Sequence, residues 1–337
     1  MPHRVLELRA VSSAHSFAAG GAAFGQNGEE GCIRVRLKEV VLKWIAGALK
    51  RIFCRLSPEA AGWFGRTLGD VVRILDIRHR RIARFNLRMA FGASKSEIEI
   101  RWILKEVFRN IGQTVVEFFQ IPSLTYEKAL GMITAEHRER LDECLRAGKG
   151  VVLVGSHFGN WELMAAAGAV AGYKISAVAR PLDDPDLEKI VREIREASGL
   201  QIIPRRTSAL AIVRKLKRNE IVGILADQNT RKQNVFVDFF GVKAATTPGP
   251  ALLALKTGAA LVPAFMLREA RGKHKLIVEK PVEVVRSGNE QADIIATTRK
   301  CAAVLEEYVR KYPTQWFWVH RRWRTRPPGE PPLYGGR

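Results

Sequence analysis

The stretch that decides the fold is residues 150–162, which reads G-V-V-L-V-G-S-H-F-G-N-W-E. Its apolar run, residues 151–154, is typical of a buried strand. Gly155 opens a glycine-containing turn, which allows the sharp change of direction that would present His157. Asn160 has the side chain that a helix beginning at the next residue needs as its cap. The pattern predicts a strand, a turn and a helix, with a histidine where the strand ends.

The same stretch carries a candidate catalytic pair, His157 and Glu162. A histidine can take a proton from an alcohol, and a carboxylate can orient the ring that does so. Residues five apart on one continuous helix point about 140° away from each other. The two side chains can therefore meet only if His157 lies in the turn. The alternative is that His157 merely ends the strand and Glu162 occupies a first helical turn, where acids are favoured.

Beyond this stretch, strands and helices alternate. Predicted strands cover residues 150–155, 174–179, 201–203, 221–226, 260–266 and 274–279, and predicted helices cover 138–147, 160–171, 184–198, 207–218, 249–257 and 290–311. This alternation predicts an α/β fold with a mainly parallel central sheet covered by helices. Ligands of such sheets bind at the carboxyl ends of the strands. His157, Arg180 and Asp227 each follow a predicted strand, so we expect them to line one crevice.

The remaining segments complete the expected organisation. Residues 1–36 are rich in Ala, Gly and Ser and predict a disordered tail. Residues 37–122 predict a helical, membrane-associating region, residues 123–327 the α/β domain, and residues 328–337 a second tail. No apolar run reaches the roughly 18 residues of a transmembrane helix. The basic helix expected at residues 40–53 suits a membrane interface, although it also suits a helix that packs on the core.

Charge and cysteine content limit the function classes. The net charge is +21, with 18 basic and 7 acidic residues in the segment 31–110 and 7 basic and one acidic in the segment 308–337. Such an excess implies an anionic partner, which by charge alone is a nucleic acid, an anionic membrane, or an acidic protein or substrate. No nucleic-acid-binding or nucleotide-binding motif is present, so we expect neither a nucleic acid nor a cofactor. The four cysteines have no metal-binding spacing.

Several motifs together carry a family resemblance. From residue 78 onward they are, in this order, R-H-R-R-I-A-R-F-N-L, G-S-H-F-G-N-W-E, A-R-P-L-D-D-P, A-D-Q-N, F-V-D-F-F-G-V-K-A-A-T-T-P-G-P-A and Q-W-F-W-V-H-R-R-W. The chain resembles the bacterial lipid A biosynthesis acyltransferases (lauroyl/myristoyl transferases) of the lysophospholipid acyltransferase superfamily. The resemblance spans about residues 37–327.

The resemblance implies an O-acyltransferase of lipopolysaccharide biosynthesis at the cytoplasmic face of the inner membrane. It would move a fatty acyl chain from acyl carrier protein, or from coenzyme A, to a hydroxyl of a lipid A precursor. His157 and Glu162 match the superfamily's histidine-x4-acid pair. Arg180 and Arg195 match arginines of its site, and Asp227 matches the acid of its D-Q motif. We expect these last three residues, with Asn160, to contact substrates.

Three questions remain open at this point. The acceptor could be another membrane glycolipid, such as a mannosylated phosphoinositide, or the chain could be a non-catalytic basic lipid-binding protein. The oxyanion of the reaction could be held by backbone N–H groups near Gly159 or by an arginine. We expect the H-R-R-W-R segment, residues 320–324, to face a membrane or phosphates, whereas Trp316, Trp318 and Trp323 suit an interfacial belt or, for two of them, the core.

Overall fold

The computed structural model describes residues 26–205 and 209–335, without the side chains of residues 26–39 and 271. The chain divides into two compact units, residues 1–44 and 45–337. The second unit contains the sheet and every residue of the candidate site, and it is described by itself below. The predicted disorder of residues 1–25 lies outside the described residues.

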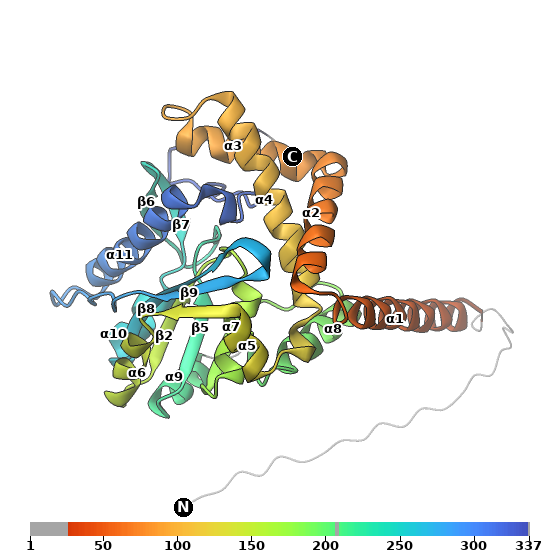
Figure 1. Ribbon diagram of the computed structural model, residues 1–337. Coiled ribbons are helices and arrows are strands. Elements are labelled where there is room, and N and C mark those ends of the chain that lie inside the picture. The colour runs from red at the N-terminus through yellow and green to blue at the C-terminus, as the bar shows by residue number, and fades with distance from the viewer. Residues whose placement is uncertain (1–25, 206–208, 336–337) are drawn as a thin grey trace, which may run out of the picture. The chain divides into compact units, whose positions relative to one another are not determined.

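A seven-stranded, mainly parallel sheet forms the centre of the second unit (Figure 1), as the sequence predicts. Its strands are β1 (Ile133–Glu136), β2 (Val151–Gly155), β3 (Ile175–Ala179), β4 (Gln201–Pro204), β5 (Ile221–Leu225), β8 (Ala260–Arg268) and β9 (His274–Val278). They lie in the order β1-β9-β8-β2-β5-β3-β4, and only β8 and β9 pair antiparallel. β2 is fully buried between β5 and β8, which accounts for its unbroken apolar run.

Helices cover both faces of this sheet. α6 (Arg138–Arg146) and α7 (Trp161–Val170) pack on one face, and α9 (Ala209–Lys217) and α10 (Gly249–Thr257) pack on the other. α8 (Pro185–Glu196) contacts β4, and α11 (Glu290–Lys311) packs against α10. The alternation in the sequence is therefore confirmed, including all six of the predicted strands.

Three helices that precede the sheet in the sequence pack beside it: α2 (Pro58–Leu75), α3 (Ile77–Phe91) and α4 (Glu97–Phe118). Ser57 caps α2, and Ser96 forms a capping box with Glu99 at the start of α4. α2 and α4 approach each other through glycines: a Cβ on Gly112 would lie 2.2 Å from the carbonyl oxygen of Gly65. Close backbone contact fixes α4, which reaches the candidate site.

A hairpin of β6 (Val235–Phe239) and β7 (Val242–Thr246) was not predicted. Phe240 and Gly241 join the two strands, and both have positive φ, as a two-residue hairpin turn requires. The hairpin packs with α3, α4, α11 and the C-terminal segment in a largely aromatic core that also includes Phe265 of β8. β1 and α5 (Tyr126–Met132) complete the elements between α4 and α6.

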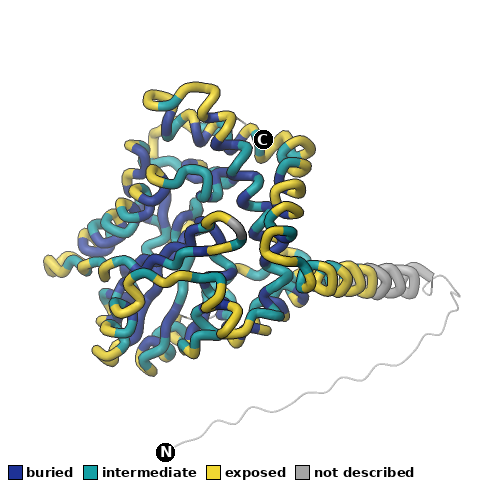
Figure 2. The backbone as a smooth tube through the Cα atoms, viewed as in Figure 1, coloured by how far each residue is buried: buried dark blue, intermediate teal, exposed yellow. Residues whose placement is uncertain are grey.

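Helix α1 (Gln26–Phe53) begins within the tail for which we expected disorder. Acidic residues near its start, Glu29 and Glu30, favour a helix N-terminus there. In the part of the chain that the structure describes, no helix is long and apolar enough to cross a membrane. Figure 2 shows the strands of the sheet mostly buried, whereas the outer faces of α2 and α3 are largely exposed.

Candidate active site

His157 lies in the turn that follows β2, at the carboxyl end of the sheet, as predicted. Its backbone N–H donates to Oδ2 of Asp227 (2.9 Å), and its carbonyl oxygen accepts from the N–H of Phe317 (3.0 Å). Asp227 follows β5, which is the parallel neighbour of β2. The parallel sheet therefore brings together two residues 70 positions apart.

The imidazole of His157 is oriented by Asp227. Nδ1 of His157 lies 2.8 Å from Oδ1 of Asp227. Burial alone opposes ionisation of this carboxyl, but His157 and the hydrogen bonds from its N–H and from the Trp316 indole lower the pKa of Asp227 to about 2. An ionised carboxylate only accepts hydrogen bonds, so the contact requires a proton on Nδ1, and in the neutral ring the lone pair is then on Nε2. Nε2 lies 3.4 Å from Nε2 of Gln228.

The predicted hydrogen bond between His157 and Glu162 is wrong. Glu162 is the second residue of α7, and its carboxylate binds Arg195 of α8 through two contacts of 2.6 and 2.9 Å. Burial opposes the charge of Arg195, but Glu162 raises the pKa of this guanidinium above its usual value. The first turn of α7 points the Glu162 side chain toward α8. Asp227, which follows the neighbouring strand β5, contacts Nδ1 of His157 in its place.

The other predicted substrate contacts lie in different surroundings. Arg180 follows β3 and is exposed, with its guanidinium 2.8 Å from Asp183. Asn160 caps α7 as predicted, since Oδ1 accepts from the N–H of Leu163. However, Asn160 is 1% exposed, and its amide nitrogen donates to Glu117, so both amide atoms bind protein and none is left for a substrate.

The N–H groups near Gly159 also have protein acceptors. The N–H of Gly159 donates to the carbonyl of Gln315 (2.8 Å), and the N–H of Asn160 donates to that of Met266 (3.2 Å). These two groups, one of the alternatives left open by the sequence, are therefore unsuited to hold an oxyanion. The next N–H groups, at Trp161 and Glu162, open α7 and have no intrahelical acceptor.

Aromatic side chains enclose the base, and sequence reasoning did not assign them to the site. The His157 ring centre lies 5.2 Å from that of Trp161 and 5.7 Å from that of Phe317. Phe317 lies just before the basic segment 320–324, which we expected to face a membrane or phosphates. Of the two alternatives for the nearby tryptophans, the structure shows the core for all three: Trp316, Trp318 and Trp323 are at most 2% exposed.

His320 fixes the loop that carries the acid. Its Nε2 accepts a hydrogen bond from the backbone N–H of Asn229 (2.9 Å), two residues after Asp227. Burial, together with nearby positive charges, lowers the pKa of His320 to about 4 despite the opposing effect of Asp227. The ring is therefore neutral near pH 7 and can accept this bond. The motif Q-W-F-W-V-H thus supplies Trp316 to Asp227, Phe317 to the base and His320 to the loop.

An apolar cavity adjoins this group. Its volume is about 80 Å³, and it lies between α7, α8 and the sheet, beneath Trp161 and the Glu162–Arg195 pair. Leu153, Met164, Leu200 and Leu225 are among its apolar walls. Within the described ranges, no group of three or more His, Cys, Asp or Glu could hold a metal ion. A histidine oriented by a buried acid is suited to deprotonate an alcohol.

The sequence was compared with models of known protein families. The model of the family described as bacterial lipid A biosynthesis acyltransferase matches residues 30–325. The chain belongs to this family. It is therefore an acyltransferase of lipid A biosynthesis type, and His157, Glu162, Arg195 and Asp227 all lie within the matched region.

Individual members of lipid A and related glycolipid acyltransferase families are also similar to this chain. The lipid A biosynthesis palmitoleoyltransferase of Escherichia coli K12 is 29% identical over 87% of this chain and 94% of the relative. The lauroyltransferase of the same organism is 28% identical over the same shares. A phosphatidylinositol mannoside acyltransferase of Mycobacterium tuberculosis CDC 1551 is 28% identical over 61% of this chain and 66% of the relative.

Proposed function

We propose that this acyltransferase moves a fatty acyl chain from acyl carrier protein to a hydroxyl of a lipid A precursor, with His157 as the general base. The observation that carries the mechanism is the 2.8 Å contact between Nδ1 of His157 and Asp227. It leaves Nε2 as the acceptor for a proton. In this proposal Asp227, and not Glu162, orients the base.

The reaction proceeds by direct transfer. Nε2 removes the proton from the acceptor hydroxyl as its oxygen attacks the thioester carbonyl, and Asp227 stabilises the imidazolium that forms. The tetrahedral intermediate collapses to the ester, and the departing thiolate receives the proton from His157. The cysteines whose pKa is shifted are unsuited to an acyl-enzyme route, because burial raises the pKa of Cys301 to about 12 and also raises that of Cys144.

The surroundings of the base suit the two substrates. The apolar cavity beside Trp161 suits the part of an acyl chain next to the thioester. The first N–H groups of α7 suit the oxyanion. Arg180 is an exposed guanidinium at the carboxyl end of β3 and suits a lipid A phosphate. Arg195 is less suited, because Glu162 already occupies its planar edge.

The decisive assay mixes the detergent-solubilised protein with a tetra-acylated lipid A precursor and acyl carrier proteins that bear different chains. We expect the lipid to gain the mass of one acyl group, and the chain that reacts fastest identifies the preferred donor. Mass spectrometry measures both. A parallel reaction offers a phosphatidylinositol mannoside, because one relative is named for that acceptor. Acylation of the mannoside alone would refute the lipid A assignment.

We also propose that the protein works at the anionic surface of the inner membrane, on its cytoplasmic face. Support comes from the apolar outer side of α2, where Trp63, Ile74 and Leu75 are 62%, 58% and 74% exposed. Exposed aromatic and aliphatic groups beside arginines such as Arg66 and Arg73 are typical of helices that lie in a membrane interface. The chain's net charge of +21 favours anionic lipids.

The double variant Trp63→Glu/Leu75→Glu tests this surface. Burying one large apolar side chain is worth about 1.5–3 kcal/mol, so we expect binding to phosphatidylglycerol-containing vesicles to fall at least about tenfold. Vesicle flotation measures the bound fraction. The matched control is Leu210→Glu on α9, which is 63% exposed and lies on a different helix. Equal loss in the control would remove the assignment to α2.

A further inference from the structure

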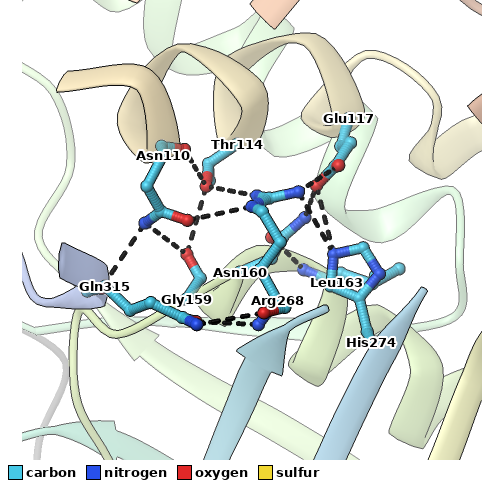
Figure 3. Close-up of polar contacts among 9 residues, drawn as sticks. All are labelled: Asn110, Thr114, Glu117, Gly159, Asn160, Leu163, Arg268, His274 and Gln315. Carbon is cyan, nitrogen blue, oxygen red and sulfur yellow. Dashed lines mark hydrogen bonds and ion pairs between the residues drawn. The ribbon is translucent and has the colours of Figure 1, made fainter. Parts of the chain in front are cut away.

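A buried polar cluster surrounds the Gly159–Asn160 turn that leads from the base into α7 (Figure 3). It consists of Asn110, Thr114 and Glu117 of α4, Arg268 at the end of β8, and His274 at the start of β9. The side chains of Arg268 and Glu117 are each 8% exposed, and His274 is fully buried. None of these residues was singled out by the sequence.

Arg268 joins the members of the cluster on α4. Its Nη1 donates to Oε1 of Glu117, its Nε donates to Oδ1 of Asn110 (2.9 Å), and its Nη2 donates to Oγ1 of Thr114 (3.1 Å). One guanidinium therefore fixes three side chains on successive turns of one helix. Bonds of this kind are stronger and more directional than neutral ones, because the donor is charged.

Glu117 links Arg268 to Asn160, the residue that caps α7. Its Oε2 accepts from Nδ2 of Asn160 at 2.5 Å, and it lies 3.4 Å from Nε2 of His274. Burial alone would raise the pKa of Glu117, but Arg268 and His274 lower it to about 2, so the carboxylate is ionised at neutral pH. An ionised acceptor orients the Asn160 amide, whose Oδ1 is thereby aimed at the N–H of Leu163.

Asn110 and Thr114 hold the backbone of the same turn. The carbonyl oxygen of Gly159 lies 3.3 Å from Nδ2 of Asn110 and 3.1 Å from Oγ1 of Thr114. Gly159 has a φ of +55°, and a Cβ there would lie 1.7 Å from the carbonyl oxygen of Met266. Gly159, two residues after His157, is therefore packed closely against β8 and hydrogen-bonded to two side chains of α4.

We propose that Glu117 and Arg268 are positioning residues: they hold the Gly159–Asn160 turn so that His157 faces Trp161 and the first N–H groups of α7. The proposal rests on the function proposed above. A buried ion pair is weak evidence for stability, because well-packed apolar replacements of both partners are often neutral. Here the bonds of the pair lead to the turn, and a displacement of about 1 Å at a reacting group can cost about 10²-fold in rate.

The test replaces both charges at once, because Glu117→Met alone would leave Arg268 buried without its carboxylate. In Glu117→Met/Arg268→Met we expect a melting temperature close to that of the wild type. We expect kcat to fall at least about tenfold while KM changes less than about threefold. The variant Glu117→Gln/Arg268→Met keeps an oxygen acceptor for Asn160 and should recover part of the lost kcat.

The matched control is a second ion pair of α4 that does not contact the turn. Arg109 binds Asp70 of α2 at 2.7 and 2.9 Å, so Asp70→Asn/Arg109→Met removes an ion pair that ties α4 to α2 and not to the turn. We expect this control to keep the kcat of the wild type. A folded Glu117→Met/Arg268→Met variant with unchanged kcat would overturn the proposal.

An arm that does not need turnover separates this proposal from the proposed function. Hydrogen exchange of the full chain is followed in the peptide that covers residues 155–165. We expect it to exchange faster in Glu117→Met/Arg268→Met, while the peptides that cover β2 and β5 keep their protection. Unchanged exchange at the turn rejects the positioning proposal. A wild type that acylates no lipid A precursor rejects the function instead.

Discussion

His157→Ala is expected to lower kcat for acyl transfer by about 10²–10⁴-fold, which is the usual contribution of a general base. The side chain is 20% exposed and lies at the end of β2, so its removal leaves the sheet unaltered. We expect the thermal unfolding curve to stay close to that of the wild type. Transfer is measured as acyl mass gained by the lipid A precursor in single-turnover and steady-state reactions.

His79→Ala is the control for this variant. His79 is also a histidine bound to a carboxylate, with 2.6 Å between its Nδ1 and Oδ2 of Asp76, but it lies at the start of α3. We expect His79→Ala to transfer acyl groups as fast as the wild type. Near-normal turnover in His157→Ala would show that the proton is removed by another group.

Asp227→Asn is expected to have the second largest effect, again about 10²–10⁴-fold on kcat. An asparagine amide can donate to the imidazole, which favours the wrong tautomer, and the loss of charge removes the stabilisation of the imidazolium. The substitution also weakens the acceptor of the Trp316 indole and of the His157 N–H. Activity is measured as for His157→Ala.

The tautomer of His157 distinguishes Asp227 from Glu162 as the orienting acid. Nitrogen-15 NMR of histidine-labelled protein reports which ring nitrogen carries the proton. We expect Nδ1–H in the wild type and in Glu162→Gln, and a shift toward Nε2–H in Asp227→Asn. If Glu162→Gln changed the tautomer and Asp227→Asn did not, the pairing seen at Nδ1 would have to be abandoned.

Local patterns were sufficient to predict the parallel sheet and the place of the base. The apolar run of β2, the turn glycines and Asn160 are close in sequence, and each has a local physical consequence. The rule that parallel strands end at one edge also brought His157 and Asp227 together. The partner of the base was nevertheless wrongly predicted, because nearness in sequence made Glu162 the obvious acid.

The missed features depend on contacts between distant segments. Asp227 and Trp316 are 89 positions apart, and Glu117 and Arg268 are 151 positions apart, so no spacing in the sequence indicates either pair. The β6–β7 hairpin is different: residues 235–239 read V-F-V-D-F, which is rich in β-branched and aromatic residues, and Phe240-Gly241 follows at once. This composition, followed by a glycine-containing turn, was a signal that could have been used.

The contribution of residues 316–320 to the site has a consequence for biosynthesis of the protein. A nascent chain that ends before Trp316 already contains all seven strands of the sheet, the base and its acid. It still lacks the indole that donates to Asp227, the ring beside His157 and the imidazole that fixes the Asn229 loop. The same segment also supplies Trp316, Trp318 and Trp323 to the core, so a product interrupted before Trp316 lacks part of its packing together with the finished site.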